Sequence, residues 1–123
     1  MRYSTVFDSD GPEKGTVVLD LGSVRESARV RVNGKEAGFA LMSPYRVRFP
    51  VRLLKRGVNT LEVEVTGTAA NRIRWNDRIG IDWKRFYDVN VVSYGYTGPL
   101  DATNWPLEDC GLLGPVSYRI DPN

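Results

Sequence analysis

Two stretches decide the fold of this chain: ARVRVNGK at residues 28–35 and NTLEVEV at residues 59–65. In the first, apolar residues alternate with arginines, and in the second leucine and valines alternate with glutamates. A period of two places the apolar residues on one face of a β-strand and the charged residues on the other. The Asn33-Gly34 pair suits the positive backbone angles of a two-residue hairpin turn. Both stretches therefore predict antiparallel strands that bury one face.

The same alternation recurs on both sides of these stretches. It is found in VVLDL at residues 17–21, in YRVRF at 45–49 and in VSYRI at 116–120. Glycine- and proline-containing turn signals separate the runs. Short strands at such spacing predict an all-β fold, an antiparallel β-sandwich or barrel.

Charged residues mark the outward positions of the predicted strands. Arginines stand at positions 29, 31, 46 and 48, and glutamates at positions 62 and 64. We expect them to form cross-strand ion pairs, which stabilise a sheet modestly. This interpretation is favoured over a phosphate-binding arginine stripe.

Composition excludes several classes of function. The chain has 123 residues, no histidine, one cysteine (Cys110) and a net charge of +2. These counts rule out Ser–His–Asp and Cys–His catalysis, an internal disulfide and a thiolate metal cluster. The basic residues are scattered and no apolar stretch has the length of a membrane span, so we predict neither a nucleic-acid partner nor a membrane partner.

A combination of motifs resembles a known type of domain. The motifs are VLDLG (18–22), ARVRVNGK (28–35), PYRV (44–47), LLKRGVNTLEV (53–63), TGTAANR (66–72) and GLLGPV (111–116). Together they resemble the galactose-binding-like, sugar-binding-type jelly roll of glycoside hydrolase family two and of related α-L-rhamnosidase-like multidomain enzymes. The resemblance covers residues 1–72 and 110–121.

This resemblance implies a domain architecture. Residues 1–123 are expected to form a single β-sandwich domain, a fragment from the C-terminal part of a larger enzyme. In such enzymes the catalytic carboxylates lie on a separate barrel, so this chain is expected to be non-catalytic.

Between residues 66 and 113 the two-residue alternation fades into a long aromatic-rich loop segment that contains all three tryptophans. Within it we predict a helical turn at residues 82–88, with Asp82 as its N-cap, and a buried strand at residues 89–92. Irregular segments of this length in a compact domain are often functional.

The loop segment supplies residue types that bind sugars, because tryptophan and tyrosine rings stack on the C–H faces of sugars and polar groups bind the hydroxyls. The predicted carbohydrate-binding residues are Asn71, Arg72, Trp75, Asp82, Trp83, Tyr87, Asn104 and Trp105. The alternative is that these aromatic side chains pack the segment against the sandwich or a neighbouring domain.

Two further sites are weaker hypotheses. The acid pairs Asp77 with Asp82 and Glu108 with Asp109 could catalyse glycoside hydrolysis, although their spacing in the sequence does not fix the distance between the two carboxyl groups. Asp8 and Asp10 offer oxygen ligands for calcium, but a charged hairpin tip is the favoured interpretation. No other cofactor is predicted.

The sequence thus predicts a non-catalytic accessory β-sandwich domain of a bacterial glycoside hydrolase, periplasmic or extracellular. Its partner would be the catalytic domain of the parent chain, with carbohydrate as a second ligand. An autonomous carbohydrate-binding module is the alternative, and a small glycosidase is the least favoured hypothesis.

Overall fold

The computed structural model describes residues 1–11, 13–83 and 101–122. The chain divides into two compact units, which are described separately. The sandwich unit comprises Met1–Thr68 and Asp109–Asn123, and the helix unit comprises Ala69–Glu108. The expectation of one domain over residues 1–123 stays a prediction.

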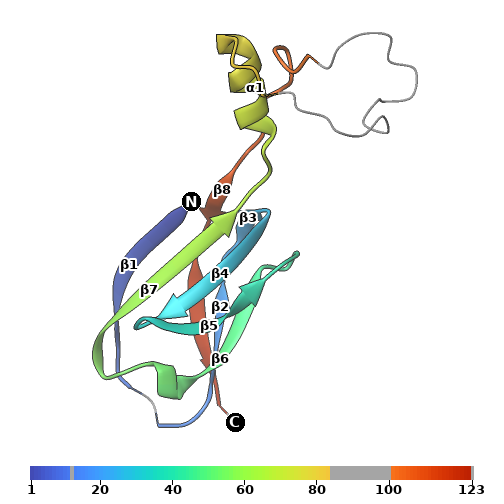
Figure 1. Ribbon diagram of the computed structural model, residues 1–123. Helices are drawn as coiled ribbons and strands as arrows, with labels where there is room; N and C mark the ends of the chain where they lie inside the picture. The colour runs from blue at the N-terminus through green and yellow to red at the C-terminus, as the bar shows by residue number, and fades with distance from the viewer. Residues whose placement is uncertain (12, 84–100, 123) are drawn as a thin grey trace. The chain divides into compact units, whose positions relative to one another are not determined.

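The sandwich unit is built from antiparallel strands (Figure 1). One sheet has the order β1 (Arg2–Ser9), β7 (Gly57–Thr66), β4 (Ser27–Val32) and β5 (Lys35–Ala40). A second has the order β6 (Arg46–Pro50), β2 (Thr16–Asp20) and β9 (Ser117–Asp121), and a short pair joins β3 (Ser23–Arg25) to β8 (Gly111–Gly114). A single 3₁₀ turn, η1 (Val51–Leu53), lies between β6 and β7. The predicted antiparallel all-β sandwich is confirmed.

The core forms where the predicted apolar faces meet. The buried side chains include Val17, Leu19, Val30, Val32, Val47, Phe49, Leu61, Val63 and Val65. Each was predicted to face inward from the period of two. Val18 is also buried although it points to the other face of β2; Arg48 and Arg119 stand opposite it in register on the two neighbouring strands. The hydrocarbon stems of arginine side chains can cover such a residue.

The hairpin between β4 and β5 turns at Asn33 and Gly34, whose φ angles are 50° and 76°. The Asn33 side chain also donates a 2.9 Å hydrogen bond to the Leu53 carbonyl and a 2.8 Å bond to Oδ1 of Asn59. Asn59 is fully buried. These bonds tie the predicted hairpin to the loop that enters β7.

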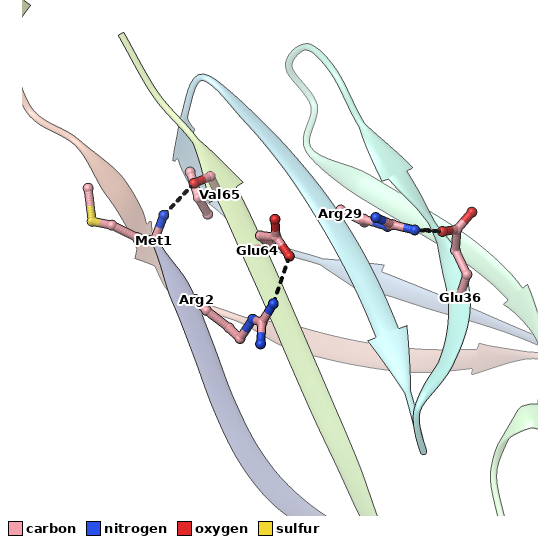
Figure 2. Close-up of polar contacts among 6 residues, drawn as sticks. All are labelled: Met1, Arg2, Arg29, Glu36, Glu64 and Val65. Carbon is pink, nitrogen blue, oxygen red and sulfur yellow. Dashed lines mark hydrogen bonds and ion pairs between the residues drawn. The ribbon is translucent and has the colours of Figure 1, made fainter. Parts of the chain in front are cut away.

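The outer charges of this sheet pair across strands, but Arg29 and Glu64 each pair with a partner other than the predicted one. The register sets Arg29 opposite Glu64 and Arg31 opposite Glu62. Figure 2 shows the ion pairs formed on this sheet, from Arg2 to Glu64 at 3.5 Å and from Arg29 to Glu36 at 2.5 Å.

For Arg46 and Arg48 the predicted pairing with glutamates was wrong. Both residues lie on β6 in the other sheet, where Arg46 contacts Asp20 at 2.6 Å and Arg48 contacts Asp121 at 3.9 Å. Alternation fixes which face a residue occupies, but it does not fix which strands share a sheet.

The helix unit contains α1 (Ala70–Ile79), which ends at Gly80 with φ 74° in the left-handed conformation typical of a helix C-terminus. For residues 70–79 the predicted irregular loop was therefore wrong. The helix has no buried residue, so it lacks the apolar stripe by which helices are recognised in sequence. The predicted strand at 89–92, and all of the helical turn at 82–88 beyond residue 83, lie outside the described residues.

Across the described residues, no helix is both long and apolar enough to span a membrane.

Candidate functional site

One side of α1 is fixed to residues 101–108 by three polar side chains, Asn71, Arg74 and Asp77. They recur at steps of three residues, which brings them to one side of a helix. All three contact backbone groups of the segment that follows, so the helix and this segment form one framework.

Asn71 and Arg74 bind the C-terminal part of residues 101–108. Nδ2 of Asn71 donates to the Glu108 carbonyl at 2.7 Å, and the Glu108 N–H donates to Oδ1 of Asn71 at 2.9 Å. Nε of Arg74 donates to the Trp105 carbonyl at 2.6 Å. The Asn71 amide is thus used within the protein.

Asp77 binds the N-terminal part of residues 101–108, and both of its carboxylate oxygens accept hydrogen bonds. Oδ1 accepts a 2.5 Å hydrogen bond from Nε1 of Trp83, and Oδ2 accepts a 2.7 Å bond from the N–H of Ala102, which is fully buried. A carboxylate held by two donors acts as a structural anchor. This use of Asp77 gives no support to the acid pair with Asp82.

The exposed surface of α1, next to these contacts, carries an aromatic residue. The Trp75 side chain is 59% exposed. Arg72 stands three residues before it and Arg78 three residues after it, and both are exposed. Residues three apart are neighbours on a helix surface. No hydrogen bond or ion pair is formed by either guanidinium within the described part of the chain.

Seven of the eight predicted carbohydrate-binding residues are described, and all seven lie in the helix unit. Asn71, Trp83 and Trp105 take part in the framework through side-chain or backbone bonds. The exposed members are Arg72, Trp75, Asp82 and Asn104. Tyr87 lies outside the described residues. Carbohydrate binding by this set stays a prediction.

The sequence places Arg74 and Arg78 among basic residues that favour an interface with an acidic partner domain over single-stranded nucleic acid, and it offers Asp77 as a catalytic acid; it does not assign Arg74 or Asp77 to the framework. A signal for the framework was present. Polar residues recur at 71, 74 and 77, and Gly80 follows as a helix stop. Steps of three that end at a glycine indicate a helix with a polar contact side.

A second candidate is a groove in the sandwich unit, formed by three neighbouring hollows along β1 and here called the β1–β9 groove, because β9 lines two of the three. Their volumes are about 160, 310 and 460 Å³. Val116 lines the first two and Tyr118 the last two, so the hollows follow one another along the strands. The middle hollow reaches core residues of both sheets, among them Val17, Leu61 and Phe49.

The rim of this groove is apolar and exposed. Val6 is 64% exposed and Val116 41% exposed. Both bordering strands are sheet edges, because β1 pairs with β7 and β9 with β2 and neither pairs with another described strand. The groove therefore combines apolar side chains with two open strand edges, which are joined at one end by the 3.4 Å hydrogen bond from the Tyr118 hydroxyl to the Asp8 carbonyl.

The calcium candidates lie at one end of this groove. Asp8 belongs to β1 and Asp10 follows it, both are exposed, and Arg56 lines the same hollow. Among the residues with described positions, no group of three or more histidine, cysteine, aspartate or glutamate side chains gathers as a metal site would require. Calcium binding stays a prediction.

Asp20 is a described group whose titration its contacts clearly alter. The Arg46 guanidinium donates a 2.6 Å hydrogen bond to Oδ2, and the Gly22 N–H donates one of 2.9 Å to Oδ1. Both contacts favour the ionised form and hold the pKa of Asp20 below its usual value.

Comparison with known proteins places the chain beside glycosidases. No family model matches it. It is 39% identical over 118 residues to a protein of Formosa agariphila named "Putative beta-glucuronidase", and the match covers 83% of this chain and 10% of that protein. Among solved structures, the rhamnosidase from Novosphingobium sp. PP1Y matches 95% of this chain with 30% identity and a TM-score of 0.67, again over 10% of its own length. The chain therefore spans about one tenth of the length of relatives that are named as glycoside hydrolases.

Proposed function

We propose that this chain is a non-catalytic accessory β-sandwich module of a multidomain glycoside hydrolase of the family-two or rhamnosidase-like type. One observation carries the proposal. Related segments occupy about a tenth of two enzymes that are named for different sugars, a glucuronide and a rhamnoside. A segment shared by enzymes of different substrate fits a supporting role better than a role in bond cleavage.

The proposal places the module in the C-terminal part of a periplasmic or extracellular enzyme. Its partner there is the catalytic domain of the same chain. A non-catalytic role agrees with the contacts of Asp77, because two donors within the helix unit already bind its carboxylate.

We propose further that an extended segment of the parent protein packs in the β1–β9 groove. The groove offers what such a segment needs: unpaired edges for backbone hydrogen bonds and an apolar floor for alternate side chains. Val6 and Val116 would lose their exposure on packing. Exposed sheet edges in proteins are usually protected, and a neighbouring segment would protect these.

A chimera tests the module. In the Formosa agariphila relative, the matched segment is either deleted or replaced by this chain, and thermal stability and hydrolysis of an aryl glucuronide are measured. We expect deletion to lower the melting temperature and the activity, and the replacement to restore both. A deletion that leaves stability and activity unchanged would refute the supporting role.

The groove is tested in the same chimera by Val116→Arg. The added charge should prevent packing and reproduce much of the effect of the deletion. Arg52→Gln, an exposed change on η1, serves as the control and should have no effect. Equal behaviour of the two variants would contradict packing at the groove.

The non-catalytic role is tested on the chain alone. Incubation with aryl β-glucuronides and aryl α-rhamnosides should give no hydrolysis above buffer. Turnover that is lost on Asp82→Asn or Glu108→Gln would overturn the proposal and favour a small glycosidase.

A further inference from the structure

The exposed side of α1 has the chemistry of a ligand platform, here called the Trp75 platform and made of Arg72, Trp75 and Arg78. Its centre is Trp75, which is 59% exposed, on a helix that Asn71 and Asp77 fix to Glu108 and Ala102. A flat ring on a fixed helix presents a constant surface to a ligand, which lowers the cost of ordering the site.

The charged side chains of the platform are both positive. On a helix of 3.6 residues per turn, Arg72 and Arg78 lie on opposite flanks of Trp75, one turn before it and one turn after it. The single acid of α1, Asp77, uses its carboxylate on Trp83 and Ala102. Arg74 is likewise engaged, by the Trp105 carbonyl. Two guanidinium groups with no described partner therefore flank the ring.

We infer that the Trp75 platform binds an anionic pyranose, with the sugar ring stacked on Trp75 and its carboxylate or sulfate held by Arg72 and Arg78. Guanidinium groups match the planar oxygens of a carboxylate and form charge-assisted hydrogen bonds with them. A neutral sugar would offer no anionic group to the two arginines. This inference rests on the carbohydrate-related function proposed above and specifies the class of sugar.

The test is a binding titration of the whole chain with tetragalacturonate, followed by calorimetry. Its methyl ester is the matched neutral ligand, and a sulfated carrageenan tetrasaccharide distinguishes sulfate from carboxylate. We expect tetragalacturonate or the sulfated sugar to bind, the methyl ester to bind at least about tenfold more weakly, and affinity to fall with added salt. Binding of the methyl ester with equal affinity would overturn the inference.

Variants assign the binding to the platform. Trp75→Ala and the double change Arg72→Gln with Arg78→Gln should each weaken binding by about tenfold or more. Leu107→Ala removes another exposed apolar side chain of the helix unit, and Arg52→Gln removes an exposed charge of the sandwich unit. Both controls should retain affinity, and circular dichroism checks that each variant is folded. Loss of binding in a folded control, or no loss in Trp75→Ala, would refute the assignment.

The outcomes separate this inference from the proposed function. If no saccharide binds and Trp75→Ala destabilises the chimera, then the platform packs against protein, which overturns the inference and leaves the accessory role intact. If saccharide binds through Trp75 while deletion of the segment leaves the enzyme unchanged, the supporting role fails and an autonomous carbohydrate-binding module is favoured.

Discussion

The buried amide of Asn59 offers the sharpest test of how this sandwich is held together. Its side chain is fully buried and makes four hydrogen bonds of 2.8 Å. Oδ1 accepts from the Lys55 N–H and from Nδ2 of Asn33, while Nδ2 donates to the carbonyls of Lys55 and Gly57. The residue thereby connects the β4–β5 hairpin to the loop before β7.

Replacing Asn59 with alanine should destabilise the chain by about 3–4 kcal/mol. Each lost bond contributes about 1 kcal/mol, and water reaching the freed groups near exposed Lys55 offsets part of the loss. Domains of this kind are stable by about 5–15 kcal/mol, so the effect is large but leaves a folded protein to measure.

Urea unfolding followed by far-ultraviolet circular dichroism measures this change, because the strands of the sandwich unit dominate that signal. All three tryptophans lie in the helix unit, so tryptophan fluorescence reports separately on that unit. The control is Val58→Ala, which changes a 56% exposed neighbour on β7 and should stay within about 0.5 kcal/mol. A loss of less than about 1 kcal/mol for Asn59→Ala would refute the role assigned to the four bonds.

Three further predictions concern charge, turn and groove. The pKa of Asp20 is lower in the folded chain than in the unfolded chain. Ionised Asp20 therefore stabilises the fold at pH values above the unfolded-state pKa, and this stabilisation is lost as the pH falls through the folded-state pKa. Arg46→Gln should therefore raise the Asp20 pKa towards its usual value in a carboxyl NMR titration, and an unchanged pKa would contradict the contact. Gly34→Ala should cost about 1–2 kcal/mol in urea unfolding, since φ is 76° and the cost is one of backbone strain. Gly34→Asn should cost clearly less because asparagine tolerates this conformation, and equal losses would argue against strain. Val116→Asp should lower the fluorescence of a bound apolar dye such as ANS, and dye binding that does not change would place the dye outside the β1–β9 groove.

The helix unit shows where prediction from sequence stops. The sequence singled out this segment because tryptophans, arginines and amides concentrate there, and carbohydrate binding by these residues stays a prediction. Their division into framework and exposed platform was not predictable. The Asn71–Glu108 contacts join residues 37 positions apart, and no local pattern encodes such a pairing.

The sequence by itself determined the strongly alternating strands β2, β4, β6 and β7 and the face by which each one joins the core. Alternation is a local property, and the turn at Asn33-Gly34 follows from the conformations open to two residues. Only the tertiary structure decided that Arg46 and Arg48 lie in a different sheet from Glu62, and that Val116 is left partly exposed beside an open edge. The physical reason is that strand pairing and exposure depend on segments far apart in the chain, which meet only when the two sheets pack.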